Sequence, residues 1–414
     1  MKLGKKWLLL TAVLLAFSMI FTACSPKEEP KDEADKTVET AEDANKDEVV
    51  DKKEESADKE EEAEKTDAEA PKGDLRILIV TSPSGVDDGS FNEDNYNGIQ
   101  EFMKSHEGST VQAVQEPTGD EMASVQAVAD TVADYDVVVT PGFQFAGISQ
   151  IANDNPDKKF ILVDSYPTAI DEKEEFENVY AMMFAEEESG FLAGIAAAME
   201  TKTNKVAVVN GIAYPSNVNY QWGFESGVNY ANKHFGTDVE VVEIESYAGT
   251  DVRGENVGGN YVGTFNDEST GKVVGEALIE KGVDIMFVAA GGSGNGVFTA
   301  AKESDNAKII GCDVDQYDDG AYSGGNVVIT SALKNMKINV DRALNKVAEG
   351  SFKGENALLR ADTDSTGIVK DEGRHQLSSE TLEKLDEAYA KLKDGSIVPA
   401  ANFNGHTPEQ FPGL

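Results

Sequence analysis

The stretch "DIMFVAAGGSGNGVFTAA", residues 284–301, contains the unit from which we expect the folded part of the chain to be built. Its first half is an apolar run that is typical of a fully buried strand. A glycine-rich loop follows, and the apolar residues beyond the loop have the spacing of a helix. A strand that is apolar on both faces and leads directly into a helix indicates a parallel sheet covered by helices.

The same alternation recurs along residues 74–414. Strand-like runs are "LRILIVT", "DVVVT", "KFILVD", "VYAMMF", "KVAVVN", "VEVVEIE", "DIMFVAA", "KIIGCDVD" and "NVVITS". Segments with helical periodicity include 121–133, 186–199, 220–233, 270–281 and 337–348. Nine such strands divide more easily into two sheets than into one, so we predict an α/β fold with two doubly wound lobes and a cleft between them.

Ligands bind to doubly wound sheets at the carboxyl ends of the strands, so the residues directly after each strand are the candidates. The loop at Gly291 and Gly292 allows a ligand to approach the backbone closely. It is not a dinucleotide fingerprint, because Val297 occupies the third glycine position counted from Gly292. It is not a Walker A loop either, since no Lys-Ser or Lys-Thr pair follows it.

Two phenylalanines stand among residues that otherwise suit helix caps. Phe91 lies in "GVDDGSFNEDNYNGI", residues 85–99, and Phe265 lies in "YVGTFNDESTGK", residues 261–272. Capping explains the neighbouring acidic and hydroxyl residues but not the aromatic rings. Aromatic rings in a cleft stack on flat ligands, although packing in a core explains a phenylalanine equally well.

An aspartate and a lysine follow two later strands. Asp313 comes after "KII", and Lys334 lies in "SALKN" after "NVVIT". The aspartate can accept both hydroxyl groups of a vicinal diol, and the lysine can donate to ribose oxygens or hold the carboxylate. A purely structural ion pair is the alternative. Cys312 in the same segment is predicted to be a small buried strand residue.

The N-terminus predicts export and anchoring. Three lysines precede an apolar run, residues 7–21, that is too short to span a membrane, so we interpret residues 1–23 as a signal peptide. "TACS" resembles the bacterial lipobox, with Phe21 where leucine is usual, and Cys24 would then be lipidated. Ordinary cleavage or an uncleaved anchor is the alternative. We expect the protein on the extracellular face of a bacterial cell membrane, held there by lipid.

Acidic residues dominate the segment after Cys24. Residues 25–73 contain 20 acidic residues, nine lysines and no aromatic residue, so residues 24–73 are predicted to be a disordered tether. Residues 74–414 carry a formal charge of −32. Such a charge repels phosphates, which excludes nucleic acid and disfavours free nucleotides, and it favours a neutral or cationic small ligand.

Six segments in this order resemble the basic membrane protein family, the purine nucleoside receptor lipoproteins of bacterial ABC transporters. They are "VDDGSFNEDNYNGI", "EEESGFLAGIAA", "YVGTFND", "AAGGSGNGV", "IIGCDVDQ" and "SALKN". The resemblance covers roughly residues 75–369 and implies a type I periplasmic-binding-protein fold, whose two lobes are joined by a hinge. We expect residues 74–185 and 316–345 in the first lobe, and 186–315 and 346–414 in the second.

The resemblance also implies roles for individual residues. In the family two phenylalanines sandwich the nucleoside base, and the motifs place them at Phe91 and Phe265. An aspartate and a lysine hold the ribose, and they fall on Asp313 and Lys334. A glycine of the glycine-rich loop, Gly291 or Gly292, lies nearby.

Three further positions complete the expected site. Asp164, after the strand "FILVD", matches a candidate base contact, and Asn92 is a further motif position. Ser82 stands where family members commonly carry an aspartate that contacts the base edge. This difference puts the purine preference in doubt but leaves nucleoside binding in place.

The expected function is capture of a nucleoside by closure of the lobes, without catalysis, cofactor or metal. The permease and its ATPase would be separate chains, because this chain has no phosphate-binding loop. A receptor for a sugar or autoinducer with the same fold is one alternative. A secreted nucleoside hydrolase that uses Asp87, Asp88 and Asp313 is the other.

Overall fold

The structure is a computed structural model that describes residues 73–414, all of which belong to one structural unit of the chain. The expected signal peptide, Cys24 and the tether up to residue 72 lie outside the described residues. Within residues 73–414, no helix is both long enough and apolar enough to cross a bilayer.

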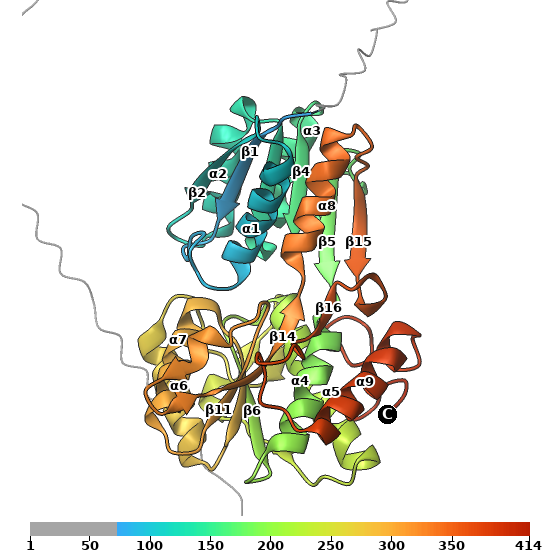
Figure 1. The fold of residues 1–414 in the computed structure, drawn as a ribbon. Coiled ribbons are helices and arrows are strands. Elements are labelled where there is room, and N and C mark those ends of the chain that lie inside the picture. Colours follow the sequence, from blue (N-terminus) through green and yellow to red (C-terminus); the bar gives the residue numbers. More distant parts are fainter. Residues whose placement is uncertain (1–72) are drawn as a thin grey trace, which may run out of the picture. The chain divides into compact units, whose positions relative to one another are not determined.

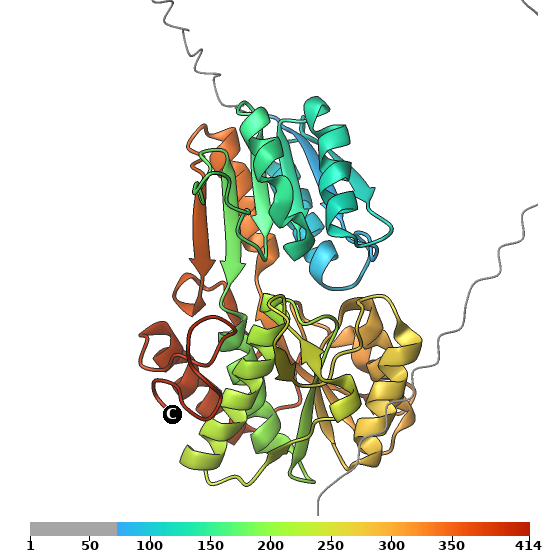
Figure 2. The same cartoon turned by 180° about the vertical axis from the view of Figure 1, so that it is seen from behind.

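Two six-stranded sheets form the frame of the structure (Figures 1 and 2). The first sheet has the order β15-β5-β4-β3-β1-β2, and its strands are β1 (Arg76–Thr81), β2 (Thr110–Gln115), β3 (Val137–Pro141), β4 (Lys159–Val163), β5 (Val179–Phe184) and β15 (Glu355–Leu359). The second sheet has the order β16-β14-β11-β10-β6-β7, and its strands are β6 (Lys205–Asn210), β7 (Glu240–Val241), β10 (Ile285–Ala289), β11 (Lys308–Gly311), β14 (Val328–Lys334) and β16 (Thr366–Ile368). All pairings within these two sheets are parallel except that of β14 with β16.

Short antiparallel pairs lie outside the two sheets. They are β8 (Gly249–Thr250) with β9 (Asn256–Gly258), and β12 (Ala321–Tyr322) with β13 (Gly325–Asn326).

Helices cover both faces of each sheet because successive residues of a buried strand point to opposite faces. In β1, Ile77 and Ile79 pack in the cluster that includes α1 (Phe91–Ser105) and α8 (Met336–Ala348). Leu78 and Val80 pack in the cluster that includes α2 (Glu121–Thr131) and α3 (Ser149–Asp154). The second sheet lies between α4 (Glu186–Glu200), α5 (Pro215–His234) and α9 (Ser379–Lys393) on one face, and α6 (Glu268–Glu280) and α7 (Gly294–Glu303) on the other.

The chain passes between the sheets three times, after β5, after β14 and after β15. We define the first lobe as residues 73–184 and 335–360, and the second lobe as residues 185–334 and 361–414. Figure 1 shows α8 and β15, both orange, next to the green strands β4 and β5 of the first sheet.

These boundaries differ from the expected ones in the C-terminal half. Residues 316–334 belong to the second lobe, and residues 346–360 belong to the first. The physical reason is the apolar face of α8, where Met336, Val340 and Leu344 pack against the first sheet. This packing carries the following segment into β15 instead of into the second lobe.

The predicted α/β class, with two parallel-sheet lobes, is confirmed. The five predicted helices are present, although α5 begins at Pro215 instead of at residue 220. The run "VEVVEIE" contributes only the two residues of β7. Strands β2, β15 and β16 were not predicted.

Candidate ligand-binding site

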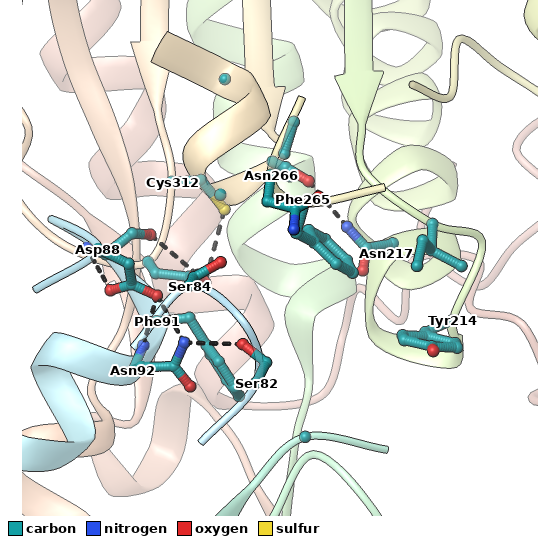
Figure 3. A pocket seen from close by; sticks show the side chains of 18 of the residues that line it. Ser82, Ser84, Asp88, Phe91, Asn92, Tyr214, Asn217, Phe265, Asn266 and Cys312 are labelled. Atoms are coloured by element: carbon teal, nitrogen blue, oxygen red, sulfur yellow. Dashed lines mark hydrogen bonds between the residues drawn. The ribbon is translucent and has the colours of Figure 1, made fainter. Parts of the chain in front are cut away.

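A cavity lies between the two lobes, at the carboxyl ends of strands from both sheets (Figure 3). Its volume is about 320 Å³, which suits a small organic ligand. Strand-end residues that line it are Ser82, Phe143 and Asp164 from the first lobe, and Gly291, Asp313 and Lys334 from the second.

The turn before α1 is held by Asp88. Its Oδ1 accepts from the backbone N–H groups of Ser90 and Glu93, each at 3.0 Å, and its Oδ2 accepts from the backbone N–H of Asn92 at 3.0 Å. Ser90, the residue at the N-cap position, makes no side-chain cap. Asp88 therefore fixes the first turn of α1, and with it the ring of Phe91 at the cavity wall.

Asn92 is oriented by the same turn. Its Nδ2 donates to Asp88 Oδ2 at 2.8 Å and to Ser82 Oγ at 3.0 Å. Two acceptors thus fix the amide group, and its Oδ1 is buried without a hydrogen-bond donor. A buried acceptor of this kind is an unusual feature that a ligand donor would satisfy.

Phe265 reaches the cavity wall from the second lobe, opposite the lobe that carries Phe91 (Figure 3). Its ring occupies the space beside Gly211, where an added Cβ would lie 2.2 Å from two ring carbons. The ring centre of Tyr214 lies 6.2 Å from that of Phe265 and 5.3 Å from that of Phe143 in the first lobe. A row of three aromatic rings therefore runs from one lobe to the other.

Lys334 is the buried cation of the site, with 3% of its side chain exposed. Its Nζ lies 2.5 Å from Asp164 Oδ2, 3.7 Å from Asp313 Oδ1 and 3.7 Å from Glu186 Oε1. Burial alone lowers the pKa of Lys334, but the attraction of Asp164, Asp313 and Glu186 outweighs it and raises the pKa. The ammonium group also lies 4.7 Å from the centre of the Phe91 ring.

Asp313 connects the lobes. Its Oδ1 accepts from the hydroxyl of Tyr220 at 2.8 Å, and its Oδ2 accepts from Ser90 of the first lobe at 3.4 Å. Asp313 and Asp164 both have left-handed backbones, with φ of 68° and 61°. Non-glycine residues seldom adopt this conformation, and such strain concentrates at functional sites.

Glu188, in the first turn of α4, binds residues of the last crossover between the lobes. Glu188 Oε2 accepts from the backbone N–H of Ala361 and from the hydroxyl of Thr366, both at 2.7 Å, and Oε1 pairs with Arg360 at 2.8 Å. Carboxylates at this end of a helix are also favoured by the helix dipole. The three glutamates Glu186–Glu188 are all buried.

Most of the residues proposed from the sequence meet at this cavity. Those that line it are Ser82, Phe91, Asn92, Asp164, Phe265, Gly291, Asp313 and Lys334. Gly292 does not line it, but a Cβ there would approach the backbone oxygen of Phe265 to 3.1 Å, so Gly292 supports the wall behind that ring. Cys312 is buried as predicted, but it lies directly after β11 and not in a strand. It lines the cavity, and burial raises the pKa of its thiol well above the usual range.

Several residues of the site were not predicted. Tyr214 was missed, although Pro215 at the first position of α5 is a recognisable signal for the helix start. Phe143 and Asn217, which line the cavity, were also missed. So was Glu186, which does not line the cavity but faces Lys334. Among residues 73–414, no cluster of His, Cys, Asp and Glu has the arrangement of a metal site.

Comparisons with known proteins agree with this geometry. A family model described as ABC transporter substrate-binding protein PnrA-like matches residues 76–251 and 255–402. The ABC transporter nucleoside-binding protein BmpA of Lactococcus lactis subsp. cremoris is 28% identical over 346 residues, which cover 78% of this chain and 89% of the relative. Basic membrane protein A1 of Borrelia garinii subsp. bavariensis is 30% identical over 330 residues, which cover 78% of this chain and 88% of the relative.

A solved structure supports the fold. The solute-binding protein of an ABC transporter system from Aeropyrum pernix K1 has a TM-score of 0.65 and 24% identity, and the match covers 80% of this chain and 94% of that chain. The expected type I periplasmic-binding-protein fold is confirmed. With the family model matched over nearly all the described residues, the chain belongs to the PnrA-like substrate-binding proteins of ABC transporters, the family that includes the basic membrane proteins.

Proposed function

We propose that the protein binds a nucleoside in the cavity between its lobes and delivers it to an ABC permease. The observation that carries the proposal is the placement of Phe91 and Phe265 on one cavity from opposite lobes. Two aromatic faces suit a flat heterocycle, and stacking stabilises a bound base by about 1–3 kcal/mol per aromatic residue. The relative from Lactococcus lactis is named a nucleoside-binding protein.

The ribose in this proposal lies against Asp313 and Lys334. The carboxylate of Asp313 accepts from the ribose hydroxyl groups, a pairing that a vicinal diol fits well. The ammonium group of Lys334 has three donors, of which one binds Asp164, so the others remain for ribose oxygens. Gly291, which lines the same cavity, lets the ligand approach the backbone closely.

The base edge in this proposal meets Asn92. Because Ser82 accepts from Asn92, the carbonyl oxygen of Asn92 is the acceptor left for a ring N–H or an amino group of the base. Inosine and guanosine carry such an N–H, but so does uridine, so this acceptor does not by itself separate purines from pyrimidines. We favour purine nucleosides because their two-ring base offers the larger flat surface to Phe91 and Phe265. Asp164 contributes indirectly, since its Oδ2 is bound to Lys334.

Uptake by closure requires no catalytic step. The lobes meet through Phe143 and Tyr214, and through Ser90 and Asp313, so a ligand between them favours the closed arrangement. Asp88, a candidate acid for a hydrolase, uses both oxygens to hold the first turn of α1. The permease and ATPase partners are separate chains in this proposal, and Cys24 carries the lipid that anchors the receptor outside the cell.

Isothermal titration calorimetry tests the ligand class. The panel contains inosine, guanosine, adenosine, uridine, ribose, hypoxanthine and inosine monophosphate. We expect the purine nucleosides to bind most tightly, and the free sugar, free base and nucleotide to bind at least about tenfold more weakly. The free sugar lacks the stacked base and the free base lacks the ribose contacts. The nucleotide carries a phosphate that the negative charge of the protein repels. Equal binding of ribose and inosine would indicate a sugar receptor, and the absence of any nucleoside response would refute the proposal. Release of hypoxanthine from inosine would indicate a hydrolase.

A further inference from the structure

Lys334 is surrounded by more buried carboxylates than one ammonium group can neutralise. Asp164, Glu186 and Asp313 face its Nζ, and Asp164 and Glu186 are 5% and 0% exposed. Other titratable groups close to the cluster are Glu187, Tyr166, Tyr220 and Cys312, all of which are acids. Asp313 is partly exposed and accepts from two hydroxyl groups, but Asp164 and Glu186 are buried, so three ionised carboxylates would leave buried negative charge without a cation, which is a large energetic cost.

Two buried oxygens of the cluster have no hydrogen-bond donor. Asp164 Oδ2 accepts from Lys334 and Glu186 Oε2 accepts from Asn219 Nδ2 at 3.0 Å, whereas Asp164 Oδ1 and Glu186 Oε1 accept from no group. Both carboxyl groups face Lys334 Nζ, Asp164 Oδ2 at 2.5 Å and Glu186 Oε1 at 3.7 Å. Burial raises the pKa of Asp164, and the Lys334 ammonium and a hydrogen bond with Glu186 oppose that rise. A single proton between them would satisfy both oxygens and would remove one of the excess charges.

We propose that Glu186 is protonated in the folded protein and donates a hydrogen bond to ionised Asp164, so that Glu186 acts as a positioning residue for Lys334. The distances decide which carboxyl keeps the proton. Lys334 Nζ lies 2.5 Å from Asp164 but 3.7 Å from Glu186, so the ammonium charge stabilises the ionised form of Asp164 far more. Burial, together with the charge of Asp164, raises the pKa of Glu186 well above its usual value.

The effect of this proton on ligand binding rests on the proposed function, that a nucleoside binds at Asp313 and Lys334. With Glu186 neutral, Asp164 is the counter-ion of Lys334, and Asp313 keeps its acceptor capacity for a ligand diol. The pair is also tied to the C-terminal part of the chain, because Asn219 Oδ1 accepts from the backbone N–H of Asn402 at 2.8 Å. Residues beyond α9 thus support the position of Lys334 through Asn219 and Glu186.

Two matched amide substitutions, Glu186→Gln and Asp164→Asn, test the assignment without any ligand. Glutamine retains an acceptor for Asn219, and its amide N–H can donate to Asp164. The readout is the thermal unfolding midpoint of the full chain and of each variant between pH 5 and pH 8. We expect E186Q to unfold at or above the wild-type midpoint at pH 7, and D164N to unfold below it.

The pH profile has a definite sign. In the wild type, folded Glu186 keeps a proton that the unfolded chain releases above its pKa of about 4.3, so wild-type stability falls as the pH rises from there towards the raised pKa of the folded state. The E186Q variant lacks this proton, so its midpoint relative to the wild type should rise from pH 5 to pH 8. Glu186→Ala should lower the midpoint at pH 7, because Asn219 and Asp164 both lose a partner.

Opposite results would overturn the proposal. If E186Q unfolds below the wild type while D164N does not, the proton belongs to Asp164. If both amides lower the midpoint equally with no difference in pH profile, both carboxyl groups are ionised. If E186A has the same unfolding midpoint as E186Q, the side chain of Glu186 does not position Lys334. Because the melts contain no ligand, a failure of nucleoside binding in calorimetry would refute the proposed function and would leave this test intact.

Discussion

Alanine at position 211 should displace the ring of Phe265 without touching the ligand. The three heavy atoms closest to a Cβ at Gly211 all belong to that ring, Cδ1 and Cε1 at 2.2 Å and Cγ at 3.0 Å. The φ angle of Gly211 is not positive, so its backbone accepts an alanine. The ring of Phe265 must therefore leave its place in the cavity wall.

The expected loss equals the contribution of one stacked ring. Stacking of a base on one aromatic residue contributes about 1–3 kcal/mol, so Kd for inosine should rise by about 5- to 150-fold. Phe265→Ala should give a similar loss. In the double variant the new methyl group no longer meets a ring, so its Kd should equal that of F265A alone, with a coupling energy of about 1–3 kcal/mol.

Calorimetry with inosine on the wild type, both single variants and the double variant measures this cycle. Gly367→Ala is a matched control, since its Cβ would meet only the hydroxyl of Tyr389 at 3.9 Å and its φ is not positive. G367A should bind inosine like the wild type. A stacking role for Phe265 is refuted if G211A also binds like the wild type, or if the losses in G211A and F265A add in the double variant.

Three further predictions concern the charges, the first helix and the anchor. Lys334→Met leaves Asp164 and Asp313 without their cation and should lower the unfolding free energy by about 3–5 kcal/mol at pH 8, measured in urea. The loss should be smaller at pH 5, because burial already raises the pKa of folded Asp164 above the unfolded value of about 3.9 and removing the ammonium raises it further, so that Asp164 of the variant is more fully protonated at pH 5. An equal loss at both pH values would contradict this. Asp88→Ala removes the acceptor of three backbone N–H groups and should lower the unfolding free energy by about 1–2 kcal/mol in the same assay. Unchanged stability would show that the turn does not depend on Asp88. Cys24→Ser should abolish the incorporation of a labelled fatty acid into the protein in the expressing bacterium, and labelling equal to that of the wild type would argue against a lipid anchor at Cys24.

The central strands could be predicted because a strand buried on both faces is a continuous apolar run. Strand β2, "TVQAVQ", is an edge strand with several partly exposed residues. Its polar side chains interrupt the apolar run by which a buried strand is recognised. Strand β16 has only three residues. The lobe boundaries could not be predicted, because a sequence does not specify which of two sheets receives a strand such as β14 or β15.

The site could be predicted where its residues follow central strands, as Asp164 and Asp313 do. Glu186–Glu188 could not be recognised, because three glutamates in a first turn are normally a solvated helix start, and nothing in their spacing indicates burial. The ion pair between Asp164 and Lys334 could not be predicted from the sequence either. It depends on the approach of the two lobes, which brings together residues 170 positions apart.

A crystal structure of the protein with inosine would show whether two phenyl rings enclose the base. We predict the hypoxanthine ring between the side chains of Phe91 and Phe265, with the ribose hydroxyl groups at Asp313 and Lys334. Inosine bound elsewhere, or bound in the cavity with either phenyl ring turned away from the base, would contradict nucleoside capture by these two rings.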